Sequence, residues 1–160
     1  MDILIQDRRK FTLMPDNQLP LDGALARQNA AQKPLVLIVE THEPSRDLMK
    51  TILLMKGCEV VEADLPEVIA VAEKFQPRLV MLDIGRPFEE GLETIKQMQT
   101  CPTLDGVPII ITSGNGTSAF REEVTTAGYD EFLVKPIDFD RLDWLLEQHL
   151  FTQNSETPSH

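Results

Sequence analysis

Short apolar runs alternate with amphipathic segments along most of this chain, and this alternation restricts the fold more than any other feature. Five runs have the length and composition of strands, and the segments that follow them repeat apolar residues at helical spacing. Strands that alternate with helices pair in parallel through right-handed crossovers. The sequence therefore predicts an α/β fold, a doubly wound five-stranded parallel sheet with helices on both faces.

The predicted elements alternate without a break. The five strands are Leu35–Val39, Glu59–Glu62 as an edge strand, Arg78–Leu82, Val107–Ile111 and Phe132–Val134. The five helices are marked in chain order by Leu48, Ile52 and Met55; by Val68, Val71, Ala72 and Phe75; by Leu92, Ile95 and Met98; by Phe120, Val124 and Ala127; and by Leu142, Leu145, Leu146 and Leu150. Pro44 suits the first turn of the first helix, Gly57 its end, and Asp138 the N-cap of the fifth.

One domain accounts for this pattern. The chain has 160 residues, of which 42% are hydrophobic and 26% charged, as in an ordinary globular domain. We place the domain at residues 34–150. Residues 1–33 mix proline and glycine with short apolar pieces that have no sustained period, so we expect a flexible N-terminal arm. Ser, Thr, Asn and Pro predict a disordered C-terminal tail over residues 151–160.

Charge and apolar patterning argue against several classes of function. The formal net charge is −11, and beyond residue 33 there are ten basic and twenty-two acidic residues, so nucleic-acid binding is not expected. The chain lacks an apolar stretch suited to a secretory signal or a membrane span. Cys58 and Cys101 lack metal-ligand spacing, and we expect both to be buried or half-buried and without function. These features indicate a reduced, cytoplasmic protein.

Chemically useful side chains follow four of the predicted strands: Glu40, Asp83, Thr112 and Lys135. The carboxyl ends of parallel strands share one edge of the sheet, where doubly wound folds bind their ligands. A carboxylate such as Asp83 can attack phosphorus if cations cancel the repulsion. Mg²⁺ held by Glu40, Asp83 and a main-chain carbonyl would do so, while Lys135 and Thr112 would contact phosphoryl oxygens. Taken singly, each residue has an ordinary alternative as a turn cap, a turn hydroxyl or a solvated charge.

At these positions the chain resembles the receiver domain of two-component response regulators, over about residues 34–150. Four motifs match in order, each weak by itself and strong in combination. They are Val39-Glu40-Thr41-His42-Glu43-Pro44, Leu82-Asp83-Ile84-Gly85-Arg86-Pro87 with Gly91, Ile111-Thr112-Ser113, and Phe132-Leu133-Val134-Lys135-Pro136. The resemblance implies the flavodoxin-like receiver fold, with strands in the order 2-1-3-4-5.

The resemblance also implies a role for each matched residue. Asp83 would be the phosphoacceptor, Thr112 and Lys135 would contact the phosphoryl group, and Gly85 would offer a backbone carbonyl to the metal. On phosphorylation Thr112 would move toward the phosphate, and Phe132, at the aromatic switch position, would follow. Phe132 is equally well explained as a core residue. The peptide bond from Lys135 to the following proline would be cis.

As a stand-alone receiver, the protein would take its phosphoryl group from a histidine kinase or a phosphotransfer protein. It would then signal to an unidentified downstream protein rather than act as an enzyme. The face formed by the fourth helix, fifth strand and fifth helix is the usual receiver dimer face. A homodimer through this face is therefore one of the open arrangements.

One departure from the family pattern affects the metal site. Receivers usually have two adjacent acids after the first strand, whereas this chain has Glu40 followed by Thr41. A neutral ligand attracts Mg²⁺ less, so we expect weakened metal binding unless Glu40 reaches the ion itself. His42 is not expected to be a further ligand, because imidazole suits softer metals and the residue lies in the loop that enters a helix. The alternative is a degenerate receiver that serves as a phosphorylation-independent binding module.

Two other classes fit less well. A haloacid-dehalogenase-like phosphatase would need an acid two residues after the nucleophile, where this chain has Gly85. A flavin-binding protein would need a phosphate loop after the first strand, whereas the acidic sequence at Glu40–Pro44 repels phosphate.

Overall fold

A computed structural model describes residues 33–129 and 131–151. The predicted N-terminal arm, apart from Lys33, and the predicted tail, apart from Phe151, lie outside these residues. Within the described part, no helix has the length and apolar character needed to cross a membrane.

The sheet has five parallel strands in the order β2-β1-β3-β4-β5, as the receiver resemblance implies. Their bounds are β1 Leu35–Val39, β2 Glu59–Glu62, β3 Leu79–Asp83, β4 Ile109–Ser113 and β5 Glu131–Val134. The first and fifth strands of the sheet are β2 and β5, which confirms the prediction that Glu59–Glu62 is an edge strand.

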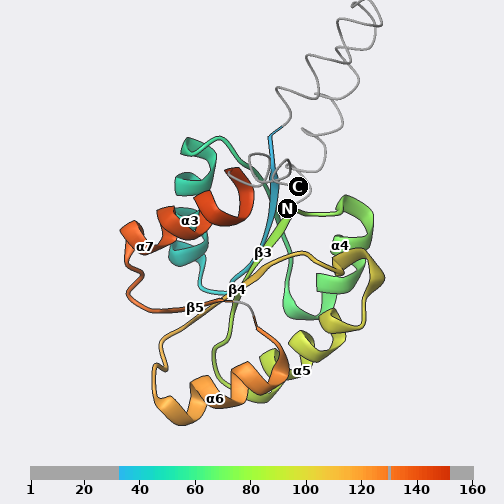
Figure 1. The fold of residues 1–160 in the computed structure, drawn as a ribbon, viewed down its shortest axis with the longest axis vertical. Coiled ribbons are helices and arrows are strands. Elements are labelled where there is room, and N and C mark those ends of the chain that lie inside the picture. Colours follow the sequence, from blue (N-terminus) through green and yellow to red (C-terminus); the bar gives the residue numbers. More distant parts are fainter. Residues whose placement is uncertain (1–32, 130, 152–160) are drawn as a thin grey trace, which may run out of the picture.

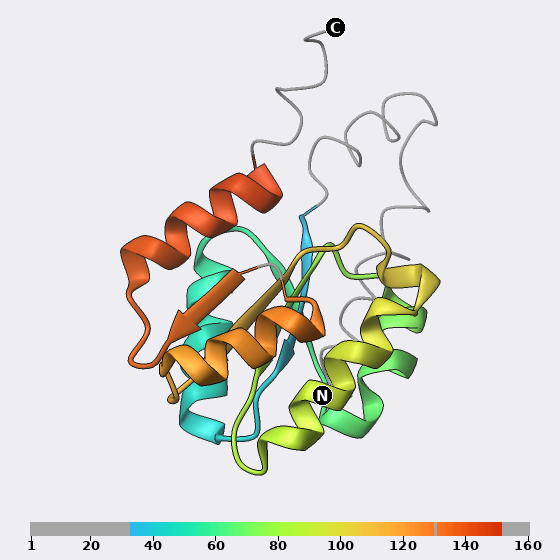
Figure 2. The same cartoon turned by 60° about the horizontal axis from the view of Figure 1, so that its bottom comes forward.

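Helices cover both faces of the sheet, which confirms the doubly wound arrangement. Helices α3 (Glu43–Met55) and α7 (Phe139–Leu146) lie on one face, and α4 (Val68–Phe75), α5 (Phe88–Gln99) and α6 (Ser118–Ala127) lie on the other (Figures 1 and 2). A turn of π-helix continues α7 over Glu147–Phe151, and short 3-10 helices occupy Leu65–Glu67 and Pro102–Leu104.

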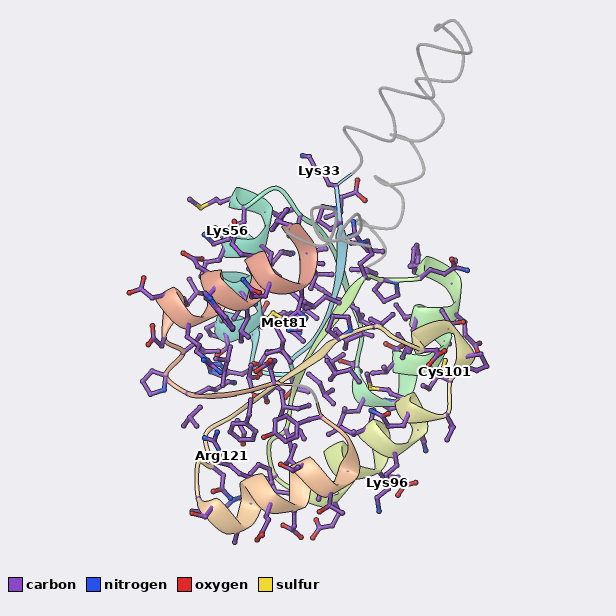
Figure 3. All side chains as sticks on the ribbon, in the orientation of Figure 1. Lys33, Lys56, Met81, Lys96, Cys101 and Arg121 are labelled. Carbon is purple, nitrogen blue, oxygen red and sulfur yellow. The ribbon has the colours of Figure 1, made fainter. Side chains whose placement is uncertain are left out.

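Each face of the sheet carries its own buried cluster. Met81 belongs to the cluster under α3 and α7, and Cys101 to the larger cluster under α4, α5 and α6 (Figure 3). Both cysteines are buried, as predicted, and burial raises the pKa of Cys58 to about 11. Alternate strand residues supply the two clusters because successive side chains of a strand point to opposite faces.

Local signals set the ends of several elements. The Asp138 carboxylate accepts hydrogen bonds from the backbone N–H groups of Asp140 (3.0 Å) and Arg141 (3.3 Å), so it is the N-cap of α7 as predicted. Gly57 follows α3 at φ +92° and Gly128 follows α6 at φ +105°. Glycine tolerates these left-handed conformations without the steric cost that a Cβ would bring.

The fourth strand differs from the prediction by two residues. Val107–Ile111 was expected, but β4 covers Ile109–Ser113, so Thr112 and Ser113 lie inside the sheet. Both polar side chains are buried with partners, since the hydroxyl of Thr112 donates to Asp83 and that of Ser113 donates to the Ile84 carbonyl. A buried hydroxyl without a hydrogen-bond partner would cost free energy. Because both hydroxyls have partners, the strand can continue through Thr112 and Ser113.

The buried side of α3 also differs from the apolar repeat that marked it. Leu53 is fully buried, and Met49 and Ile52 pack beside it, whereas Leu48 is 53% exposed and Met55 80% exposed. The helix carries apolar residues on more than one side, so spacing identified a helix without identifying its core face.

Candidate functional site

Four strand ends bring the predicted site residues to the carboxyl edge of the sheet. Glu40 follows β1, Asp83 ends β3, Thr112 lies in β4 and Lys135 follows β5. In the β3–β4 register Asp83 stands opposite Thr112. The structure therefore collects at one edge the four side chains that the sequence distributes over almost one hundred positions.

Lys135 is the centre of this group. Its Nζ lies 2.8 Å from Oδ1 of Asp83 and 2.8 Å from Oε1 of Glu40. Burial lowers the pKa of Lys135, but hydrogen bonds and Coulomb attraction from the two carboxylates raise it, and the net shift is upward from the usual lysine value. The ammonium therefore stays charged and is shared between two acids.

Thr112 contacts the same carboxylate oxygen as Lys135. Its Oγ1 donates to Oδ1 of Asp83 at 3.2 Å, and the residue is 5% exposed. A hydroxyl and an ammonium thus converge on one oxygen of Asp83. Groups in this arrangement can hold the oxygens of a tetrahedral anion bound at the carboxylate.

Ser113 supports the turn that follows Asp83. Its hydroxyl donates to the Ile84 carbonyl at 2.8 Å and accepts from the backbone N–H of Asn115 at 3.2 Å. In the sequence this serine was part of the Ile111-Thr112-Ser113 motif, without a role of its own. Its partner across the sheet is fixed by strand register, which no local pattern contains.

The loop after β1 holds Glu40 in place. Oε2 of Glu40 accepts from the backbone N–H of His42 at 3.1 Å, and Nη1 of Arg46 donates to the Glu40 carbonyl at 3.3 Å. Glu40 is only 8% exposed. The imidazole of His42 lies against Ser45, with Nδ1 2.8 Å from Oγ, so it contacts the helix start rather than the carboxylates.

A second ion-pair group adjoins this loop and was missed in the sequence. Glu62, at the end of β2, lies 3.0 Å from Nζ of Lys50 and 3.9 Å from Nε of Arg46. Arg46 therefore links the Glu40 backbone to a buried carboxylate on the neighbouring strand. Helical spacing could have placed Arg46 and Lys50 on one side of α3, but only the sheet order brings Glu62 beside them.

The atoms near Asp83 that could bind a metal are oxygens, which suit a hard divalent cation. Glu40 and Asp83 are carboxylates, and the Gly85 backbone passes beside Asp83, since a Cβ built on Gly85 would lie 3.7 Å from Oδ2. No group of three His, Cys, Asp or Glu residues suited to a metal occurs within 33–129 and 131–151. Glu40, Asp83 and the Gly85 carbonyl would offer only oxygen donors, which Mg²⁺ prefers. Two of these donors are carboxylates, rather than three.

Phe132 belongs to an aromatic group on the α4–α6 face of the sheet, in which Phe120 and Phe132 are buried and Phe88 and Tyr129 are partly buried. Its ring is 6.1 Å from Phe120 and 5.9 Å from Tyr129, both in edge-to-face geometry, and Phe120 lies 4.7 Å from Phe88 at the start of α5. The guanidinium of Arg121 lies 4.9 Å from the Phe132 ring centre. Phe132 is 6% exposed, so in this conformation it is a core residue.

Two peptide bonds that precede proline near the site are cis. The bond from Lys135 to Pro136 is cis, as the resemblance implied. The bond from Arg86 to Pro87 is also cis, which the sequence did not indicate.

Comparison with known proteins gives consistent results. The model of the response regulator receiver domain matches residues 36–147. The chain is 30% identical over 123 residues to the KDP operon transcriptional regulatory protein KdpE of Escherichia coli, covering 76% of this chain and 53% of KdpE. It is 25% identical to the polar-differentiation response regulator DivK of Brucella anthropi, covering 72% and 94%. Chemotaxis protein CheY4 of Vibrio cholerae superposes with a TM-score of 0.67 at 25% identity, covering 74% and 99%.

Proposed function

The chain belongs to the response regulator receiver domain family of two-component systems, and from this premise we propose that Asp83 accepts a phosphoryl group from a histidine kinase or phosphotransfer protein. The observation that carries the proposal is that an ammonium and a hydroxyl both contact one carboxylate oxygen of Asp83. Lys135 lies 2.8 Å from Oδ1, and Thr112 donates to the same atom at 3.2 Å. This chain spans only 53% of the length of KdpE, so the proposal concerns the receiver region and not the activity of the whole of KdpE.

The transfer is a displacement at phosphorus. An oxygen of the Asp83 carboxylate forms the new P–O bond, while the bond between phosphorus and the donor breaks and its electron pair leaves with the donor. Lys135 and Thr112 would hold two of the phosphoryl oxygens, which their contacts with Oδ1 of Asp83 support. Removal of either should slow transfer because the charge at these oxygens would lose a fixed partner.

Mg²⁺ is the proposed cofactor, held by Glu40, Asp83 and the Gly85 carbonyl. When bound, the ion would neutralise charge on the carboxylates and the arriving phosphoryl group. Thr41 supplies no charge at the position where the family pattern has a second acid. We therefore propose a metal site that works with reduced affinity.

The output is proposed to be a protein contact rather than an enzymatic reaction. Thr112 would shift toward the phosphoryl group and Phe132 would follow, which would change the face made by α6, β5 and α7. On this face Trp144 is 53% exposed and Val134 37% exposed. Such apolar exposure suits a downstream protein or a second copy of the chain. We place this signalling in the cytoplasm.

Labelling with an acyl phosphate tests the proposal. The protein, an Asp83→Ala variant and an Asp105→Ala control are incubated with acetyl phosphate, with and without Mg²⁺, and their intact masses are measured. Asp105 is an exposed acid in a loop away from the site. We expect one added phosphoryl group that requires Mg²⁺, is absent from Asp83→Ala and persists in Asp105→Ala. No addition, while a known receiver labels normally, would indicate a degenerate binding module instead.

A further inference from the structure

A cavity of about 390 Å³ opens beside the site, between α3 and the segment that leads into α7. Glu40, Asp83, Thr112 and Lys135 form its polar end. The rest of its wall is mainly apolar and includes Ile38, Leu48, Met49, Met81, Ile137 and Phe139. Met81 lines the cavity and belongs to the cluster under α3 and α7, so the cavity lies on that face of the sheet. Figure 3 labels Met81 between these two helices and the sheet.

A phosphoryl group at Asp83 requires only the polar end of this cavity. The cavity as a whole, at about 390 Å³, is within the volume range of small-molecule sites, and most of its wall lies beyond that polar end. Two of its residues are unusually exposed for their type, since Leu48 is 53% exposed and Phe139 46% exposed. An apolar wall that continues from a charged end to exposed Leu and Phe side chains matches a ligand with a phosphoryl group at one end and an apolar body at the other.

We infer that the cavity binds the acyl group of a small acyl phosphate, so that Asp83 accepts phosphate more readily from aromatic or long-chain acyl phosphates than from acetyl phosphate. This inference rests on the proposed function of Asp83. Lys135 is the one cation among the described lining residues. It can hold the phosphoryl group, whereas a donor with further anionic groups would meet two carboxylates and an apolar wall.

The reaction balances without another reactant. The Asp83 carboxylate attacks phosphorus, the P–O bond to the acyl carboxylate breaks, and that carboxylate leaves with the electron pair. One carboxylate and one acyl phosphate thus give one aspartyl phosphate and one free carboxylate, with no proton gained or lost. The cavity acts on this step by holding the acyl group while phosphorus faces Asp83.

The test compares benzoyl phosphate with acetyl phosphate as donors at concentrations below saturation. Initial labelling rates are measured for the unaltered chain and for Leu48→Ser, Phe139→Ser and Met55→Ser. Met55 is the matched control, because it lies on the same helix as Leu48, is 80% exposed and is not part of the cavity wall. Circular dichroism confirms that each variant is folded. For each protein, the rate with benzoyl phosphate is divided by the rate with acetyl phosphate. The two donors differ in intrinsic reactivity by the same factor in every variant, so a change in this ratio between variants reports the cavity.

We expect the benzoyl-to-acetyl ratio to fall about tenfold in Leu48→Ser and Phe139→Ser and to stay unchanged in Met55→Ser. Equal ratios in all four proteins, with Asp83 still labelled, would overturn the inference and leave the proposed function intact. Equal ratios combined with slower transfer from a phosphorylated histidine kinase in Leu48→Ser would assign the cavity to a side chain of that kinase, which also overturns it.

Binding of benzoyl phosphonate separates the two proposals if no donor labels the protein. Its P–C bond does not break, so calorimetry in the presence of Mg²⁺ reports cavity binding alone. Binding that Leu48→Ser weakens and Met55→Ser leaves unchanged would support the cavity even if Asp83 is not phosphorylated. No binding to the unaltered chain would overturn the inference, whatever the labelling result.

Discussion

Glu40 and Lys135 form an ion pair across the carboxyl edge of the sheet, with Nζ 2.8 Å from Oε1, although 95 positions separate them in the chain. The same ammonium lies 2.8 Å from Oδ1 of Asp83. One internal cation therefore serves both carboxylates of the proposed metal site. A divalent ion entering this site meets carboxylates whose charge Lys135 already partly neutralises. This should lower the affinity for the ion further, beyond the loss expected from Thr41 in place of a second acid.

Thr41→Asp should tighten Mg²⁺ binding. The change adds a carboxylate after Glu40 at an exposed position, where it brings charge without a burial cost. We expect a gain of about tenfold or more in affinity, because ligand charge sets the affinity of such sites over several decades. Calorimetry measures it, with Thr41→Asn as the neutral control of similar size. Equal affinities for the Asp and Asn variants would show that position 41 does not face the ion.

Lys135→Met should destabilise the fold. It removes the cation shared by two largely buried carboxylates, and we expect a loss of about 1–2 kcal/mol in the free energy of unfolding, below the value for a fully buried pair because Lys135 is partly exposed. Lys56→Met is the control. Its ion pair with Asp143 is as short, at 2.6 Å, but both side chains are more exposed, so the loss should stay near or below about 0.5 kcal/mol. Similar losses in urea unfolding would contradict a special role for Lys135.

From neutral pH upward, the contribution of Lys135 to stability should change only in the strongly alkaline range. Its pKa is raised in the folded protein, so the stabilisation is fully present below the ordinary lysine pKa of about 10.4 and is lost as pH rises through the raised value. The difference in unfolding free energy between the unaltered chain and Lys135→Met should therefore be the same at pH 7 and pH 9. A difference that already disappears at pH 9 would mean that the ion pair is not its source.

Gly91→Ala should disturb the turn after Asp83. A Cβ at this position would lie 2.8 Å and 2.9 Å from two carbons of the buried Ile84 side chain, closer than such contacts allow. We expect a loss of about 1–3 kcal/mol from overpacking, together with slower labelling of Asp83. Gly114→Ala is the control, because a Cβ there meets nothing within 4 Å. Thermal unfolding of both variants would show whether the effect is steric or common to Gly→Ala changes.

Phe132→Ala should be much more costly than Phe139→Ala. Phe132 is 6% exposed and contacts Phe120 and Tyr129, whereas Phe139 is 46% exposed. We expect losses of about 3–5 kcal/mol and about 1 kcal/mol or less, respectively. Urea unfolding measures both. A small loss for Phe132→Ala would mean that its ring leaves the core at low cost, as a switch residue in equilibrium between two positions would.

Much of the fold follows from local patterns. The alternation of strands and helices predicted the doubly wound sheet, because the period of the apolar residues is set by the geometry of each element alone. The Asp138 N-cap was predicted for the same reason, since its partners are its own near neighbours in the chain. The two-residue shift of β4 shows the limit: polar Thr112 and Ser113 belong to the strand only because partners on β3 and in the turn after it satisfy them.

The sequence by itself determined the class of fold and the types of side chain that close four of its strands, through composition, spacing and the order of the motifs. Tertiary structure alone decided that Lys135 joins Glu40 to Asp83, that Arg46 links the Glu40 loop to Glu62, and that an apolar cavity adjoins the site. These relationships join residues from different strands and helices. Their distances depend on sheet order, strand register and helix packing, which are properties of the whole chain rather than of any segment.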